Sequence, residues 1–191
     1  MSNKMRLEIR VAGFGGQGII SAGLMLAVAA SIHSDRNAVQ TRSYGPESRG
    51  GACKSEVVIS DGEIDFPTVT EPDVLVVMSQ EAYNTYVDTV KKGGTLLLDS
   101  DMVPKEKATP HIRVFRLPAT KIAEEVGKTL VANVVMLGAL TSITNLVSAE
   151  SIKKSILSNI PKGAKKLNLV AFKRGYDYGK RLLKEKEIGR N

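Results

Sequence analysis

The chain has 191 residues, of which 42% are hydrophobic and 25% are charged, and this is typical of one globular domain, here residues 1–191, with a substantial buried core. No apolar run is long and clean enough to span a bilayer, so a membrane protein is not expected. The formal charge of +7 is uneven, because residues 1–152 hold 15 Lys or Arg against 17 Asp or Glu, whereas residues 153–191 hold 12 against 3.

The first predicted element is a strand that runs into a glycine-rich turn and then a helix. The apolar stretch 7–12 precedes the turn, and apolar residues at 19–30 follow it. Glycines permit a tight turn and close backbone approach, while free N–H groups at a helix N-terminus attract anions. The site residues predicted in this turn are Gly13, Gly15, Gly16, Gln17 and Gly18. The pattern also occurs as a purely structural turn, so both interpretations stay open.

The second predicted strand, residues 38–41, ends without the acidic residue that a dinucleotide site needs. An Asp or Glu at this point holds the ribose hydroxyls in nucleotide-binding folds of this kind. Here Arg42 follows the strand, and a guanidinium can bind the 2′-phosphate of a nicotinamide dinucleotide phosphate. A free-standing NADP-binding reductase therefore stays open as an alternative.

A second glycine-rich loop follows this strand, with the sequence Ser43-Tyr-Gly-Pro-Glu-Ser-Arg-Gly-Gly51. It lies just past the carboxyl end of a strand, where open α/β sheets bind ligands. Arg49 stands beside two glycines and can present its guanidinium to a phosphate or carboxylate. The site residues predicted in this loop are Ser43, Tyr44, Arg49, Gly50 and Gly51. The alternative is a surface loop whose glycines only make turns.

The remaining elements alternate between strands and helices. A strand at 54–59 is followed by Asp61-Gly62, which predicts a tight hairpin turn with a return through residues 64–66. Further strands are predicted at 73–78, 95–99 and 112–116, and helices after Ser79 and at 120–126, 131–143, 149–159 and 164–184. This alternation predicts a three-layer α/β/α, Rossmann-like fold with a mostly parallel sheet and an antiparallel hairpin at one edge.

The predicted C-terminal helix, residues 164–184, carries much of the basic excess. Such a face can dock an acidic partner or a polyphosphate, and it can equally be a solvated helix surface. Nucleic-acid binding is not expected, because few aromatic residues accompany the basic ones and the sequence holds no familiar nucleic-acid module.

Metal and thiol chemistry are not expected from this chain. Its single cysteine, Cys53, excludes an intramolecular disulfide and a self-contained thiolate site for zinc or an iron–sulfur cluster. His33 and His111 are its only imidazoles, and neither has a carboxylate pair at ligand-like spacing. Basic residues near the N-terminus are followed by Glu8 and the glycine-rich turn, which fit a signal peptide poorly, so a cytoplasmic protein is expected.

Together, the two glycine-rich loops resemble those of the gamma subunit, or gamma domain, of 2-oxoacid:ferredoxin oxidoreductases. The resemblance follows the family's order from about residue 6 to residue 180. It includes Asp61-Gly-Glu-Ile64, Asp73-Val-Leu-Val-Val77, Gly93-Gly94 and Asn133 followed by Leu137-Gly-Ala139. The second loop, with Pro-Glu-Ser-Arg-Gly-Gly, looks most like the 2-oxoglutarate branch.

The resemblance implies a subunit and not a complete enzyme. Family holoenzymes use thiamine diphosphate and magnesium to decarboxylate a 2-oxoacid, pass electrons through iron–sulfur clusters to ferredoxin, and transfer the acyl group to coenzyme A. This chain has one cysteine and no Gly-Asp-Gly motif with a downstream Asn-Asn. The thiamine-binding alpha and beta subunits and a ferredoxin-like delta subunit are expected to hold those groups, and no catalytic residue is assigned to this chain.

The task that the resemblance leaves for this chain is to complete the active-site assembly and help bind coenzyme A. The 3′-phosphate and pyrophosphate of coenzyme A suit a helix N-terminus and an arginine. In a plainer interpretation, both loops only pack against the catalytic subunits. A small subunit of an indolepyruvate- or branched-chain-type oxidoreductase is a further alternative, because the oxoacid is expected to be selected by the thiamine-binding chains.

Overall fold

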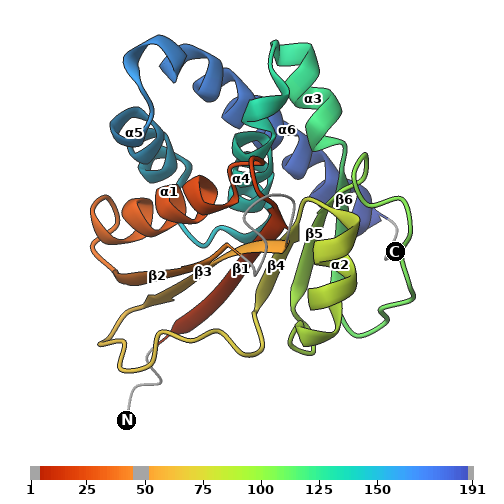
Figure 1. Cartoon of the computed structure of the whole chain (residues 1–191). Helices are drawn as coiled ribbons and strands as arrows, with labels where there is room; N and C mark the ends of the chain where they lie inside the picture. The colour runs from red at the N-terminus through yellow and green to blue at the C-terminus, as the bar shows by residue number, and fades with distance from the viewer. Residues whose placement is uncertain (1–4, 45–51, 189–191) are drawn as a thin grey trace.

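The structure is a computed structural model that describes residues 5–44 and 52–188. Within these residues, a sheet of six strands lies between helices (Figure 1). The strands are β1 (Arg6–Phe14), β2 (Asn37–Ser43), β3 (Ala52–Ser60), β4 (Val74–Val77), β5 (Thr95–Asp99) and β6 (Arg113–Leu117). Their order across the sheet is β2-β3-β1-β4-β5-β6.

Every strand but β3 runs in the same direction. The pairs β1–β4, β4–β5 and β5–β6 are parallel, while β3 is antiparallel to both β1 and β2. The carboxyl ends of the five parallel strands therefore meet at one edge of the sheet. All four residues of β4 are buried, as expected for a parallel strand that is covered on both faces.

The antiparallel part of the sheet differs from the prediction. Residues 61–66 do not form a hairpin return after Asp61-Gly62 but lie in bends and irregular chain. Both edges of β3 are already paired, one with β1 and the other with β2. A return strand would have no free edge of β3 to join, so the antiparallel strand is β3 itself, inside the sheet.

The helices lie close to their predicted positions. They are α1 (Ile19–Ser31), α2 (Gln80–Tyr86), α3 (Ala119–Val126), α4 (Ala132–Thr144), α5 (Ala149–Asn159) and α6 (Lys165–Ile188), with 3-10 turns η1 (Val87–Thr89), η2 (Thr129–Val131) and η3 (Lys162–Ala164). The helical layer of α1, α4, α5 and α6 covers one face of the sheet, and α2 packs on the other (Figure 1). The predicted three-layer α/β/α fold is confirmed.

The helix after Ser79 is shorter than its apolar spacing suggests. The Ser79 side chain accepts a hydrogen bond from the N–H of Ala82 and caps α2, as predicted. At the other end, the Thr89 hydroxyl donates to the carbonyl of Tyr86 at 2.7 Å. This local bond competes with the helical pattern, and the chain tightens into η1.

The helices α4 and α6 approach each other through glycines. A Cβ added to Gly175 would lie 1.9 Å from the carbonyl oxygen of Val135, and one on Gly138 would lie 2.2 Å from that of Phe172. One on Gly179 would lie 2.2 Å from the Ser142 hydroxyl. Gly138, Gly175 and Gly179 thus form a seam at which the two helix backbones touch.

The last turns of α6 reach the edge strand β6. The Lys186 ammonium donates to the carbonyl of Val114 and lies 4.2 Å from the centre of the Phe115 ring. This contact occupies one of the open hydrogen-bonding groups of the edge strand, which could otherwise pair with another chain. Although α6 is 24 residues long, none of the helices described is both long and apolar enough to cross a membrane.

Candidate functional site

The glycine-rich turn lies at the carboxyl edge of the sheet, between β1 and α1. Gly16 and Gly18 have φ values of 100° and 74°, a region that L side chains rarely adopt. Gly13 has a different requirement, because a Cβ there would lie 2.3 Å from the Oε1 atom of Gln17. The backbone of the turn therefore needs glycine at 16 and 18, and the absence of a Cβ at 13 leaves room for the Gln17 side chain.

The Gln17 side chain fastens the turn to the neighbouring strand. Its Oε1 accepts a hydrogen bond from the N–H of Phe14 at 2.9 Å, and its Nε2 donates to the carbonyl of Met78 at 2.6 Å. Both ends of the amide are thus used within the chain. The sequence predicts Gln17 as a ligand-binding residue. In this structure its side chain holds the turn against the end of β4.

Asn133, at the start of α4, fastens the same turn from the helical side. Its Nδ2 donates to the carbonyl of Gly18 at 3.0 Å, and a Cβ on Gly18 would lie 2.4 Å from that nitrogen. Sequence reasoning did not assign Asn133 to the site. The available signal was its position as an amide within the otherwise apolar run 130–140.

The N-terminus of α1 opens from this turn without a cap. Gly18 is the N-cap residue, and the described structure gives α1 no side-chain cap and no acidic residue in its first turn. The first N–H groups of a helix have no intrahelical partner, and the helix dipole is positive there. A carboxylate or phosphate group can therefore bind at this point.

A small cavity of about 210 Å³ lies beside the turn. It is lined by Phe14, Gly16, Gln17, Met78, Met102, Thr120, Thr129, Leu130 and Ala132. Most of its surface is apolar, and Leu130 at its rim is 67% exposed. The turn and the cavity together place backbone amides next to an apolar wall, which suits a ligand with one charged and one apolar part.

The second predicted loop is described in part. Ser43 ends β2 and Tyr44 follows it with 60% exposure. They lie at the same carboxyl edge as the turn, and β3 separates β2 from β1, so two strand spacings, or about 10 Å, lie between them. Arg49, Gly50 and Gly51 lie outside the described residues, and their part in the site stays a prediction.

Asp99 is a buried carboxylate at the end of β5, next to the cavity. It accepts hydrogen bonds from the N–H groups of Ala119 and Thr120, each at 3.1 Å, and from the Thr120 hydroxyl at 2.6 Å. Burial raises the pKa of Asp99 above its ordinary value, against the opposing effect of these bonds. Asp99 therefore anchors the start of α3 beneath one wall of the cavity.

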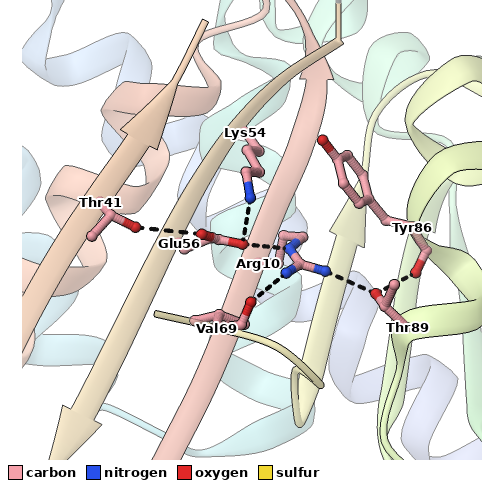
Figure 2. A network of polar contacts seen from close by, with 7 residues as sticks. All are labelled: Arg10, Thr41, Lys54, Glu56, Val69, Tyr86 and Thr89. Atoms are coloured by element: carbon pink, nitrogen blue, oxygen red, sulfur yellow. Dashed lines mark hydrogen bonds and ion pairs between the residues drawn. The ribbon is translucent and has the colours of Figure 1, made fainter. Parts of the chain in front are cut away.

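On the opposite face of the sheet, Arg10 of β1 and Glu56 of β3 form a buried ion pair. The Nε atom of Arg10 donates to Oε1 of Glu56 at 2.7 Å, and the two residues are 4% and 5% exposed. Figure 2 shows the guanidinium between Glu56 and the chain around η1. Arg10 also donates to the carbonyl of Val69 at 2.6 Å and to the Thr89 hydroxyl at 2.8 Å.

The Glu56 carboxylate is shared with two more donors. The ammonium of Lys54 lies 3.0 Å from Oε1, and the Thr41 hydroxyl donates to Oε2 at 3.4 Å (Figure 2). The Arg10 guanidinium lies 5.1 Å from the centre of the Tyr86 ring. The polar groups of Arg10 and Glu56 are used within this network. The network therefore joins β1, β2, β3 and η1, and we do not assign it a ligand.

Cys53 is buried in β3, and burial raises the pKa of its thiol, so the reactive thiolate is disfavoured. Among residues 5–44 and 52–188, no group of three or more His, Cys, Asp and Glu side chains is placed to hold a metal ion.

Comparison with known proteins gives a match along most of the chain. The model of the pyruvate ferredoxin/flavodoxin oxidoreductase family matches residues 8–178. The chain is 55% identical to the 2-oxoglutarate synthase subunit KorC of Methanocaldococcus jannaschii, over 94% of this chain and 97% of that subunit.

Two solved structures are similar in fold as well as in sequence. The gamma subunit of a keto/oxoacid ferredoxin oxidoreductase from Geobacter sulfurreducens has a TM-score of 0.82 and 43% identity, over 91% of this chain and 98% of that one. A 2-oxoglutarate:ferredoxin oxidoreductase from Magnetococcus marinus, with 2-oxoglutarate, coenzyme A and succinyl-CoA bound, has a TM-score of 0.81 and 28% identity. That match covers 94% of this chain and 31% of the longer one.

Proposed function

The chain belongs to the pyruvate ferredoxin/flavodoxin oxidoreductase family, as a gamma-type subunit most like the 2-oxoglutarate branch, and we propose that it completes the active-site assembly of such an enzyme and helps bind coenzyme A. It is an oxidoreductase subunit of the 2-oxoglutarate synthase type that is not catalytic alone. The reaction proposed for the complex is oxidative decarboxylation of a 2-oxoacid, 2-oxoglutarate in the first instance, to an acyl-CoA. In this proposal residues 1–191 act as one domain in the cytoplasm.

The other cofactors of the reaction are assigned to partner subunits. A chain with one cysteine, itself buried, does not fit an iron–sulfur cluster. The sequence also lacks the Gly-Asp-Gly and Asn-Asn pair that the resemblance requires for thiamine diphosphate and magnesium. We assign these groups to thiamine-binding alpha and beta subunits and a ferredoxin-like delta subunit, with ferredoxin as the electron acceptor.

The observation that carries the coenzyme A role is the uncapped start of α1 beside an apolar cavity. Coenzyme A has phosphate groups joined to a long pantetheine arm, whose methyl and methylene groups alternate with amides and which ends in a thiol. Backbone amides at Gly16 and Gly18 suit the phosphates, and the wall made by Phe14, Met78 and Leu130 suits the arm. The Magnetococcus marinus relative is described with coenzyme A bound, which supports this choice of ligand.

The proposal is tested first by purifying the chain from its host under anaerobic conditions. Recovery of thiamine-binding and cysteine-rich subunits, together with 2-oxoacid-dependent dye reduction, would support the subunit role. Recovery of the chain alone, without such activity, would contradict it and favour the NADP-binding alternative, which NADPH fluorescence on mixing would test directly.

The coenzyme A site is tested in the reconstituted complex with two matched variants. Leu130→Asp places a charge at the exposed rim of the cavity, and Leu157→Asp makes the same change at an exposed leucine of α5. We expect Leu130→Asp to raise the KM for coenzyme A about tenfold, the cost of losing one apolar contact, and to leave the KM for the oxoacid unchanged. Equal effects of the two variants would contradict the site, as would an unchanged KM in Arg49→Ala.

A further inference from the structure

A groove between α3 and α6 lies apart from the turn and the cavity. It has a volume of about 460 Å³ and lies where the two helices pack together in the helical layer (Figure 1). Its charged lining consists of the cations Lys121, Arg174 and Arg181 and the carboxylates Glu125 and Asp177. The proposed coenzyme A role does not use this groove.

Both carboxylates of the groove already have cationic partners. Glu125 forms an ion pair with Arg174 across the groove at 2.5 Å, and Asp177 forms one with Lys173 at 2.5 Å along α6. No ion pair of Lys121 is found in the part of the chain that the structure describes. The groove therefore has an excess of positive charge at its surface.

Arg181 lies against an aromatic ring of the same helix. Its guanidinium lies 4.2 Å from the centre of the Tyr178 ring, and its only described carboxylate contact is a loose one, 3.9 Å to Glu185. Stacking on a ring keeps a guanidinium flat and leaves its edge free for a carboxylate. Such a side chain loses less conformational entropy when it binds.

The groove belongs to the strongly basic part of the molecule. α6 carries eight Lys or Arg side chains and three carboxylates. Residues 1–152 have more acidic than basic residues, so the basic excess is confined to the C-terminal part of the chain. A surface with an excess of positive charge on an otherwise balanced protein attracts an acidic partner to that surface.

The local chemistry favours protein carboxylates over phosphates as ligands. Phosphates bind well at free helix N-termini, but the first N–H groups of α3 are taken: those of Ala119 and Thr120 by Asp99, and that of Lys121 by Asp101. Glu125 and Asp177 also lie among the cations of the groove, so its positive charges are separated and not gathered at one point. An acidic peptide carries one negative charge on each of several separated side chains. This spacing matches a groove in which cations and carboxylates alternate.

We propose that the groove between α3 and α6 docks an acidic segment of another subunit of the same complex, with Lys121 and Arg181 binding its carboxylates. This inference rests on the proposed function, because it needs a chain that works within a multisubunit oxidoreductase. The Ile122 side chain and the Tyr178 ring, which also line the groove, would make apolar contacts with the aliphatic parts of the docked segment.

The test compares two charge reversals of equal size in the anaerobically purified complex. The groove variant is Lys121→Glu with Arg181→Glu, and the control is Lys153→Glu with Lys154→Glu on the exposed side of α5. All four side chains are exposed, and thermal melting of each isolated chain checks that it folds. The measured quantity is the dissociation constant of the chain from the remaining subunits, at several salt concentrations.

We expect the groove variant to bind about tenfold or more weakly than the wild type and to lose part of its salt dependence, while the control changes by less than about threefold. Equal weakening in both variants, or none in either, would overturn the docking site and leave the proposed function intact. A wild-type chain that joins no complex would overturn both. Binding of inorganic triphosphate to the wild-type chain but not to the groove variant would overturn the acidic segment as the occupant.

Discussion

On the helical side of the sheet, α4 and α6 touch through glycines over a mainly apolar core. On the α2 side, a guanidinium from β1 and a carboxylate from β3 form a buried ion pair on the face of the sheet. The two sides therefore respond to different kinds of substitution. A change of volume is costly on the helical side, because close-packed backbones have no space to yield. On the α2 side, the costly change is one that leaves a buried charge without its partner.

The largest effect is expected from Glu56→Ala. It leaves the guanidinium of Arg10 buried without its carboxylate, which costs about 3–5 kcal/mol of unfolding free energy. Urea unfolding of the isolated chain measures this loss. The double variant Arg10→Met, Glu56→Leu removes both charges and should be more stable than Glu56→Ala, and the opposite order would show that volume and not charge governs this side.

A smaller loss is expected on the helical side from Gly175→Ala. The new methyl group would overlap the carbonyl of Val135, and overpacking of this kind costs about 1–3 kcal/mol. Gly163→Ala is the matched control, because a Cβ there meets no atom within 4 Å. Urea midpoints should fall for Gly175→Ala and stay nearly unchanged for Gly163→Ala; similar midpoints would mean that the helices separate easily.

The smallest effect concerns Asp99, a buried carboxylate on the helical side. Its raised pKa means that the folded state holds the proton more tightly than the unfolded state. The resulting stability is present in full below the unfolded pKa, near 3.9, and is lost as the pH rises through the folded value. The stability of the wild type relative to Asp99→Asn should thus decrease from pH 4 towards pH 7, as measured by melting temperature, and an increase would contradict the sign.

Most of the fold could be predicted because it follows from local patterns. Apolar runs bounded by glycine or serine identified the strands at 73–78 and 95–99, and α5 has its predicted bounds, 149–159. The hairpin at 61–66 failed because turn chemistry is local, whereas pairing depends on which edges of β3 are free. No local pattern shows that β2 and β1 occupy both edges.

The candidate site was predictable in position but not in its internal bonds. The turn at 13–18 and the end of β2 do lie at one edge of the sheet, as the strand–turn–helix order suggests. The roles of Gln17 and Asn133 depend on partners 61 and 115 residues away. The pairing of Arg10 with Glu56, across 46 residues, likewise requires the strand register.

The two sides of α6 differ in which substitutions they can accept. Along the side that faces α4, positions 175 and 179 have room for a hydrogen atom and no more, so a larger side chain there would push the two helices apart. The outward side carries charges that contribute little to folding, so its pattern can be altered one residue at a time without loss of the fold. The packing of α6 against α4 and the charge pattern on its outward side are therefore set by different residues of the same helix.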